Sequence, residues 1–141
     1  MNFLLEIVTP DRTAYTDSVD AVSVPTPQGT ISVLPRHAGL FTVLSEGEIK
    51  VTTANKHLYL AIGGGFMEVT KKIVSILVSR AVHADEINER AIKEAQERAK
   101  EVLAHKGKGE EFSAAQAIMR RSLLELKVLR RHRSRQMPLT H

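Results

Sequence analysis

With 141 residues, the chain can form one ordinary domain, or one small domain with an appendage. A hydrophobic fraction of 43% predicts a folded core. Because Trp is absent and aromatic residues make up only 4%, Val, Ile, Leu and Ala must supply that core. The chain has no Cys, which excludes disulfides and thiolate metal sites.

The net charge of +4 is distributed unevenly along the chain. Residues 1–84 carry seven Lys or Arg and seven Asp or Glu, residues 85–111 carry six and eight, and residues 112–141 carry seven and one. This pattern predicts a neutral body, an acidic-leaning middle and a basic end. No apolar run approaches the about 18 residues that span a bilayer, and the first residues do not resemble a signal peptide.

Residues 1–84 are predicted to form a body of short antiparallel strands. Turn signals separate β-prone segments at intervals of about 8–12 residues, and no helical period intervenes. The expected strands are 3–8, 19–24, 30–34, 40–44, 48–52, 57–62, 66–69 and 73–79. Strands 48–52 and 57–62 alternate, which predicts one buried and one solvated face for each. The fold class is therefore a β-sandwich or barrel of about eight to ten strands.

The most sharply bounded strand covers residues 30–34, which lie between two clusters of proline and glycine. Proline fixes φ and cannot donate a ladder hydrogen bond, so these clusters mark where the strand begins and ends. The cluster after the strand carries Arg36 and His37 on a stiff tip, and this pair is the best candidate for a contact with a partner. The alternative is that both are loop residues without a partner.

Residues 85–141 are predicted to form two antiparallel helices. Asp85 is a good N-cap for the first helix, and a narrow, alanine-rich stripe follows it. The stripe consists of Ile87, Ala91, Ala95, Ala99, Val102 and Leu103. Residues 106–109 end this helix, and the capping box of Ser113 and Gln116 begins the second one. The apolar face expected on the second helix consists of Ile118, Met119, Ser122, Leu123, Leu126 and Leu129.

An alanine seam has a consequence for how firmly the helix pair is held. Alanine removes little apolar area from water, so at about 25 cal/mol per Å² it stabilises packing less than leucine would. We therefore expect the helix pair to dock weakly and to leave its partner at a cost of about a few kcal/mol.

None of the sequence motifs predicts catalysis. Gly63, Gly64 and Gly65 lack the P-loop pattern and no helix follows them, so a bend or a close backbone approach explains them. The six histidines lack the spacing of metal ligands, and no Ser–His–Asp set or pair of buried carboxylates stands out. We interpret the chain as non-catalytic and expect no metal or cofactor.

The basic run 130–135 is compatible with several partners. Nucleic acid and acidic lipid both bind such runs, but a solvated helix end also explains the run, and it holds no aromatic residue for base stacking. An acidic protein partner is favoured, because the charge lies on a helix with an apolar face. The alternative function is a nucleic-acid-binding β-barrel with a basic helical tail. A small β-fold enzyme would need a polar pocket that the sequence does not indicate.

The order of these parts is similar to that of a known family. The segment L-P-R-H-A at 34–38 is followed by G-G-F-M-E-V at 64–69 and by V-S-R-A at 78–81, before an acidic helical start. With this spacing over essentially the whole chain, the sequence resembles the epsilon subunit of bacterial F-type ATP synthase. The resemblance implies a β-sandwich of about ten strands over residues 1–84 and a helical-hairpin regulatory domain over residues 85–141.

The resemblance also implies a function. Members of this family are non-catalytic central-stalk subunits that rotate with the gamma subunit and couple the catalytic head to the ring of c subunits. Their helical hairpin lies on the body or extends into the head, where it blocks ATP hydrolysis. The location implied is the cytoplasmic face of the bacterial inner membrane, as a peripheral part of a proton-translocating complex. The stromal face of plastid thylakoids is less favoured, and no nucleic-acid partner is implied.

Two sets of contact residues follow from matching positions. The c-ring contact maps to Thr30, Arg36 and His37, although relatives often have glycine where this chain has Ser32 and Arg36. Basic residues of the second helix are expected to meet the beta and alpha subunits of the head, chiefly an acidic loop of the beta subunit. These residues are Arg120, Arg121, Lys127, Arg130 and Arg131.

A third set consists of residues that match an ATP-binding site of the family. Some bacterial relatives bind ATP through an I/L-D-x-x-R-A signature at the start of the first helix. The matching residues here are Ile87, Asn88 and Arg90, together with Arg120 on the second helix. The signature is one residue short, Asn88 replaces the aspartate, and Leu124 occupies the place of a further family arginine. We therefore expect no tight binding of regulatory ATP.

Overall fold

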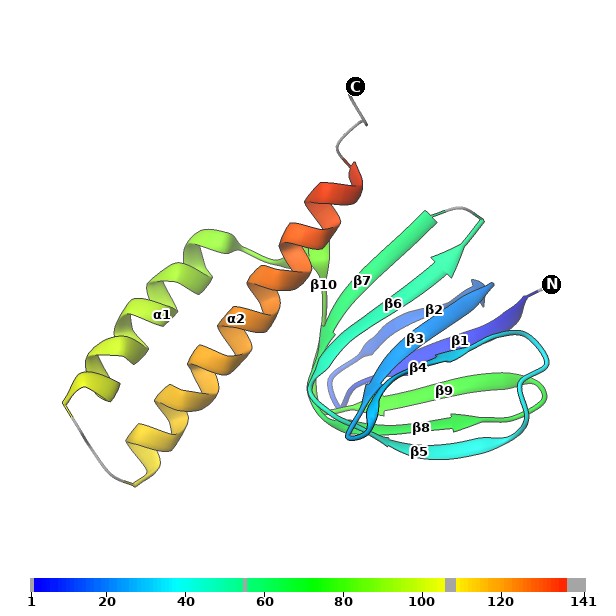
Figure 1. Ribbon diagram of the computed structural model, residues 1–141, viewed down its shortest axis with the longest axis horizontal. Coiled ribbons are helices and arrows are strands. Elements are labelled where there is room, and N and C mark those ends of the chain that lie inside the picture. The colour runs from blue at the N-terminus through cyan, green and yellow to red at the C-terminus, as the bar shows by residue number, and fades with distance from the viewer. Residues whose placement is uncertain (1, 55, 106–108, 137–141) are drawn as a thin grey trace.

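The computed structural model describes residues 2–54, 56–105 and 109–136. A β-sandwich forms the first part of the chain, and two long helices follow and lie beside it (Figure 1). The predicted fold class, an antiparallel sandwich followed by a helical hairpin, is confirmed.

Within the described residues, ten strands form two sheets of five. The first sheet has the order β2 (Thr13–Val19), β1 (Phe3–Val8), β9 (Ile73–Val78), β8 (Gly65–Val69) and β5 (Leu40–Leu44). The second has the order β10 (Ala81–His83), β7 (Lys56–Ile62), β6 (Gly47–Thr53), β3 (Ala21–Thr26) and β4 (Gly29–Val33). Paired neighbours run antiparallel except β1 and β9, which run parallel.

The core lies between the two sheets and consists of aliphatic side chains, as the composition predicts. Leu5, Val22, Ile49 and Ile76 come from four different strands, and none of them is exposed. Along β3 and β6, buried residues alternate with half-buried ones, because successive side chains of a strand point to opposite faces. The alternation predicted for residues 48–52 is therefore confirmed.

Strand β7 departs from the predicted pattern of one buried and one solvated face. Tyr59, Leu60, Ala61 and Ile62 are all buried. Leu60 and Ile62 belong to the sandwich core, whereas Tyr59 and Ala61 pack against helix α2 (Glu110–Gln136). The face that the sequence assigned to solvent is thus covered by the helical tail.

Two strands, β2 and β10, are absent from the sequence-based prediction. Both lie at the edge of a sheet, next to a single neighbouring strand. Strand β2 is largely exposed and polar, so it carries no apolar alternation, and β10 has only three residues. These two strands form because they pair with β1 and β7, and a pairing with another segment leaves no pattern in the strand's own sequence.

The triple glycine carries the chain from β7 in one sheet to β8 in the other. A Cβ on Gly65 would collide with the backbone of Leu77 and Val78, and a Cβ on Gly63 would collide with the Ser79 hydroxyl. The close backbone approach predicted for these glycines is therefore confirmed.

The helical part begins with a short 3-10 turn. Its elements are η1 (Ala84–Glu86), α1 (Glu89–Ala104) and α2 (Glu110–Gln136). The prediction that Asp85 caps the first helix is wrong, because Asp85 lies in η1. The N-cap is Asn88, whose side-chain oxygen accepts a hydrogen bond from the Ala91 backbone N–H at 3.1 Å.

Helix α2 begins before the predicted capping box. Ser113 and Gln116 lie inside the helix, so they do not form that box. The Ser113 N–H donates instead to the Gly109 carbonyl at 3.1 Å. Gly109 adopts φ 93°, which favours glycine, and Glu110 and Glu111 place carboxylates in the first turn, where the helix dipole favours them. The rest of the predicted glycine loop, residues 106–108, lies outside the described residues.

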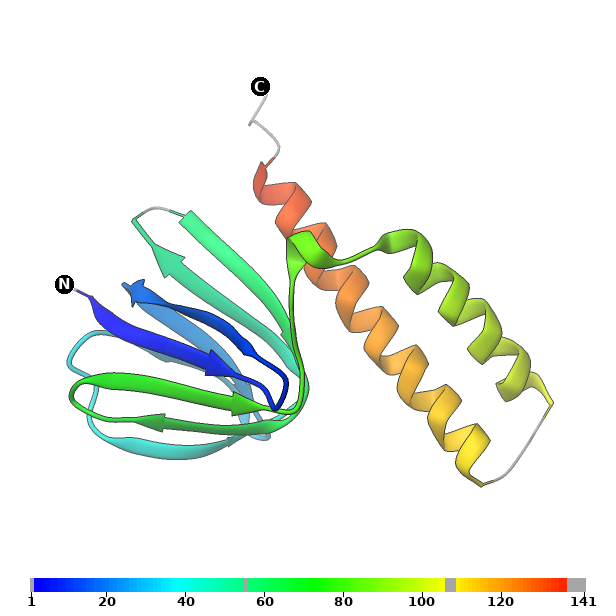
Figure 2. The ribbon, with the colours of Figure 1, turned by 180° about the vertical axis from the view of Figure 1, so that it is seen from behind.

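The two helices pack through small side chains. On α1, Ile92 and Ala99 are buried, whereas Ala91 is exposed, so the predicted stripe is wrong at Ala91. On α2, the buried residues are Ala115, Ser122, Val128 and Leu129, and Ile118 and Leu123 are exposed. A single apolar face does not describe α2, because α2 packs against α1 on one side and against β6, β7 and η1 on another. Figures 1 and 2 show α2 between α1 and the sandwich.

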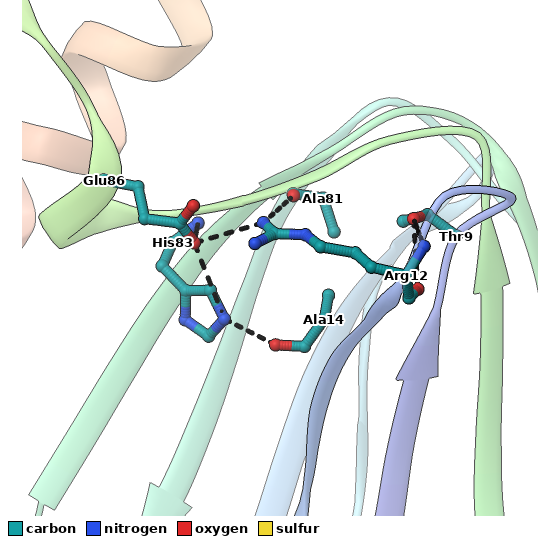
Figure 3. Close-up of polar contacts among 6 residues, drawn as sticks. All are labelled: Thr9, Arg12, Ala14, Ala81, His83 and Glu86. Atoms are coloured by element: carbon teal, nitrogen blue, oxygen red, sulfur yellow. Dashed lines mark hydrogen bonds and ion pairs between the residues drawn. The ribbon is translucent and has the colours of Figure 1, made fainter.

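A cluster of polar contacts holds the junction between sandwich and helices (Figure 3). Arg12, from the turn between β1 and β2, donates to the Glu86 carboxylate and to the Ala81 carbonyl, both at 3.1 Å. His83 donates through Nε2 to the Ala14 carbonyl at 2.6 Å, and its backbone N–H donates to Glu86 at 3.4 Å. These contacts tie β10 and η1 to the sandwich, so the helices leave the body from a fixed point.

We predict that Glu86→Gln destabilises the chain near neutral pH but not in acid. Burial alone would raise the pKa of Glu86, but the hydrogen bond and charge of Arg12, with His83, lower it below its ordinary value of 4.5. A carboxyl with a lowered pKa stabilises the folded state above its ordinary pKa, and this contribution is lost as pH falls through the folded pKa. The expected loss at pH 7 is about 0.2–1 kcal/mol in the free energy of unfolding, measured with urea.

Glu101→Gln is the matched control, since Glu101 is an exposed carboxylate of α1 with no ion pair in the described part of the chain. It should leave stability unchanged at both pH values. A difference between Glu86→Gln and the natural chain that persists at pH 3 would contradict the assignment.

Candidate functional site

The basic face of α2 is turned toward acidic residues of its own sandwich. Arg120 donates through Nε to the Glu46 carboxylate at 2.8 Å. Eleven residues further along the helix, Arg131 lies 3.0 Å from the Glu48 carboxylate. Glu46 and Glu48 come from the turn between β5 and β6 and from the start of β6. Two of the basic residues of α2 are thus paired with carboxylates of the same chain.

Glu48 occupies an unusual environment for a carboxylate. Its side chain is only 14% exposed, and Oε2 has no hydrogen-bond partner. Burial raises the pKa of Glu48 by more than the nearby charges of Arg131, Lys127 and Lys50 lower it. The ion pair with Arg131 therefore orients the two side chains more than it stabilises them.

Two further ion pairs connect the helices to their surroundings. Arg80, which follows β9, pairs with Glu125 of α2, and their side chains are 26% and 13% exposed. Arg133, near the end of α2, donates to Glu89 at the start of α1 at 2.8 Å. Together with the contacts of Arg120 and Arg131, these pairs fix α2 along its length.

The remaining residues of the predicted beta-subunit contact lie on the outside of α2. Arg121, Lys127 and Arg130 are exposed. Arg130 donates through Nε to the Leu126 carbonyl of its own helix at 3.4 Å, and Lys127 acts on the charge of Glu48. The five basic residues therefore divide into two that are paired with the sandwich and three that are open to solvent.

The residues predicted to bind ATP are only partly brought together. Ile87, Asn88 and Arg90 line an open hollow of about 700 Å³ at the start of α1. Arg120 does not line it, because it lies further toward the start of α2 and pairs with Glu46.

The charges in this hollow do not suit a polyphosphate. Glu89, Glu94 and Glu97 contribute three carboxylates to its lining, against the cations Arg90 and Lys93. Arg90 lies 3.4 Å from Glu94, and Lys93 lies 3.1 Å from Glu89, so both cations are already paired. The Asn88 side chain is engaged as the helix cap.

The residues predicted to meet the c ring lie at two ends of one strand. Thr30 is exposed and pairs with Pro25 beside the turn between β3 and β4. Arg36 and His37 follow the other end of β4, in the segment that lies at the end of the sandwich away from the helices (Figure 1). The rise of about 3.3 Å per residue separates Thr30 from this tip by more than 10 Å along β4.

The tip itself has a strained residue. Arg36 adopts φ 65°, a left-handed conformation that glycine reaches at lower energy than other residues. The His37 ring nitrogen Nδ1 lies 2.7 Å from the Ala38 carbonyl. Arg36 and His37 border a cavity of about 390 Å³ whose lining includes Leu34 and Lys71. The backbone thus explains why glycine suits position 36.

The sequence-based reasoning missed an apolar patch on the outer face of the first sheet. The outer apolar patch consists of Phe41, Val43, Phe66 and Leu77, whose exposed fractions are 64%, 49%, 49% and 53%. Phe66 pairs across the sheet with Val43 and with Leu77, and the rings of Phe41 and Phe66 stack at 5.7 Å. A signal was present in segment 40–44, where both alternating faces are largely apolar.

Neither a metal-binding cluster nor a membrane-spanning helix is found among the described residues. They contain no group of three or more His, Asp or Glu placed to hold a metal ion. Neither described helix is long and apolar enough to cross a membrane.

Comparison with known proteins gives matches that agree with one another. The family described as "ATP synthase, Delta/Epsilon chain, beta-sandwich domain" matches residues 2–84. The ATP synthase epsilon chain of Herpetosiphon aurantiacus is 38% identical over 136 residues, covering 96% of this chain and 100% of that protein. The epsilon chain of Chloroflexus aggregans is 36% identical, covering 92% of this chain and 93% of that protein.

Solved structures support the same fold. A chain from the Euglena gracilis mitochondrial ATP synthase, in a structure described as "OSCP/F1/c-ring", aligns with a TM-score of 0.65 and 22% identity, covering 96% of this chain and 82% of that one. A chain from the Tetrahymena thermophila mitochondrial ATP synthase, described as "central stalk/cring", aligns with a TM-score of 0.58 and 15% identity, covering 92% of this chain and 97% of that one. At these identities the likeness concerns the fold alone. The sequence matches show that the chain belongs to the ATP synthase delta/epsilon family, among its epsilon chains.

Proposed function

We propose that this epsilon chain is a non-catalytic subunit of the central stalk in a bacterial, proton-translocating ATP synthase. In this role the sandwich connects the gamma subunit to the c ring, and the helices regulate ATP hydrolysis by the catalytic head. The complex would hold the chain at the cytoplasmic face of the inner membrane. The family match and the exposed patch on the sandwich support this reading, and no observation favours the nucleic-acid-binding alternative.

The observation that carries the stalk assignment is the outer apolar patch. Phe41 and Phe66 are two of the four Phe residues of the chain, and they are 64% and 49% exposed. Contiguous exposed apolar side chains on a sheet mark an interaction surface. A cavity of about 480 Å³, lined by Pro10, Phe66 and Leu77 among others, adjoins the patch and gives a partner side chain a place to insert. The gamma subunit is the proposed occupant.

We predict that Phe41→Ser and Phe66→Ser each weaken binding to the gamma subunit by about tenfold or more, because aromatic anchors dominate such interfaces. Both side chains are largely exposed, so the free energy of unfolding should change by no more than about 0.5 kcal/mol. Binding is measured by pull-down titration with purified gamma subunit. Leu123→Ser, on an equally exposed residue of α2, is the control, and equal binding by all three variants would contradict the assignment.

The c-ring contact is proposed at the tip that carries Arg36 and His37. This tip and the helical hairpin lie at opposite ends of the molecule (Figure 2), so contact with the membrane ring leaves the helices accessible. Thr30 lies near the other end of β4 and would contribute only if the contact extended along the strand.

The regulatory role is proposed for the helices because the apolar contact between α2 and the sandwich is small. The apolar contact between α2 and the sandwich consists of Val128 and Leu124 against Tyr59, Ala61 and Ala84, with Ile87 beside them. Two of these are alanines, so the contact stabilises the docked helix by about a few kcal/mol. A partner in the catalytic head that binds the basic residues of α2 can offset this amount.

We predict that removing residues 110–141 raises ATP hydrolysis by the assembled enzyme by about fivefold or more, since the inhibitory helix is lost. The deletion begins where α2 begins. ATP synthesis coupled to the proton gradient should remain, because the sandwich is intact. Hydrolysis that stays the same after the deletion would remove the inhibitory part of the proposal and leave the stalk assignment standing.

We also propose that the folded hairpin does not bind ATP tightly. The hollow at Asn88 and Arg90 presents three carboxylates, and Arg120 is committed to Glu46. Isothermal titration of the full chain with ATP should give a dissociation constant weaker than about 1 mM. A micromolar dissociation constant would overturn this part of the proposal.

A further inference from the structure

The turn between β5 and β6 is built to present two carboxylates. Gly47 separates Glu46 from Glu48, and a Cβ on Gly47 would lie 2.8 Å from the Pro25 side chain. The Ser45 N–H donates to the Pro25 carbonyl at 3.1 Å. These contacts press the turn against β3 and leave Glu46 and Glu48 on the side that faces α2. We call these two residues and their turn the acidic turn.

The acidic turn is occupied by side chains that are far apart on α2. Arg120 and Arg131 are separated by eleven residues, which is about three helical turns and about 16 Å. Their spacing places them on the same side of the helix, and each reaches one carboxylate of the turn, at 2.8 and 3.0 Å. Lys127 lies between them in sequence and acts on Glu48. The acidic turn thus gathers the basic face of α2 at one place on the sandwich.

We propose that the acidic turn is an internal docking surface that competes with an acidic protein partner for Arg120 and Arg131. The inference rests on the proposed function, in which the released α2 meets an acidic loop in the catalytic head. An arginine paired with Glu46 or Glu48 cannot pair with that loop at the same time. The sandwich therefore holds α2 through the same kind of contact that the partner offers. Each of the two acidic surfaces lowers the apparent affinity of α2 for the other one.

The carboxylates of Glu46 and Glu48 do not contribute equally to holding α2 on the sandwich. The Glu48 side chain is largely buried and one of its oxygens is unpartnered, so removing its charge also removes a desolvation cost. Glu46 is more exposed, at 28%, and its partner Arg120 is 65% exposed, so the charge of Glu46 acts on α2 with a lower desolvation cost than that of Glu48. A substitution at Glu46 therefore tests the competition for Arg120 with less disturbance of buried packing than a substitution at Glu48.

The test compares Glu46→Lys with Glu101→Lys in the full chain. Both variants make the same change in net charge, but Glu101 lies on α1 and has no ion pair within the described ranges. A fluorescent decaglutamate peptide is the probe, and fluorescence anisotropy at low salt reports its binding. Glu46→Lys should bind the peptide about threefold to tenfold more tightly than Glu101→Lys, because Arg120 is released and α2 is repelled from the turn.

Two further variants keep the result interpretable. Glu46→Gln, which preserves the shape of the side chain, should give a smaller gain of about twofold to threefold. Adding Arg120→Gln and Arg131→Gln to Glu46→Lys should abolish the gain, since the competed side chains are then absent. Equal peptide binding by Glu46→Lys and Glu101→Lys would overturn the proposal.

Hydrolysis by the assembled enzyme separates this inference from the proposed function. If removal of residues 110–141 relieves inhibition, Glu46→Lys should hydrolyse ATP more slowly than Glu101→Lys, because its α2 is freer to reach the head. Equal rates for these two variants, with inhibition present, would contradict the competition. If the deletion changes nothing, the inhibitory role fails, and the peptide measurement still decides whether the acidic turn competes for α2.

Discussion

Strand β7 is the element on which the arrangement of this chain depends, because it is covered on both faces. Leu60 and Ile62 fill the sandwich core, while Tyr59 and Ala61 receive Val128 of α2. The same strand thus completes the sandwich and provides the surface on which α2 packs. This apolar contact is small and rich in alanine, so by itself it positions α2 without holding it strongly. Ion pairs between α2 and the sandwich supply the orientation that the apolar contact lacks. Two of these pairs use Arg120 and Arg131, which are among the basic residues proposed to meet an acidic partner.

Much of the fold could be predicted from the sequence, because local pattern and final structure agree over most of the body. The strands around Ile49 and Ile76 carry β-branched or alternating residues, and composition alone predicted an aliphatic core. Strands β2 and β10 could not be predicted, since edge strands are defined by their neighbours. The helix starts were misplaced for a related reason. Asp85 is a good cap by residue type, but the contacts of Glu86 with Arg12 hold that segment in a 3-10 turn and leave capping to Asn88.

For the candidate surfaces as well, features of one segment could be predicted from the sequence, whereas contacts between distant segments could not. The basic face of α2 was visible in the sequence, because seven of the eight charged residues from 112 onward are Lys or Arg. Its partners were not, since Glu46 and Glu48 lie more than 70 residues away and their pairing depends on how α2 crosses the sandwich. The outer apolar patch left a local signal in segment 40–44, but only the sheet register shows that Phe66 joins it. At position 36, the left-handed backbone explains a preference for glycine that the sequence resemblance alone could not explain.

We propose that α2 exchanges between a docked position on β7 and a position in contact with the catalytic head. The chain contains no Cys, so spin labels can be attached at two introduced cysteines, one at Thr16 on exposed β2 and one at Gln116 on exposed α2. The distance between the labels is measured by pulsed electron paramagnetic resonance, in the isolated chain and in the assembled, hydrolysis-inhibited enzyme. We expect a single distance in the isolated chain and a second, longer distance in the inhibited enzyme. The same single distance in both samples would contradict the proposed exchange.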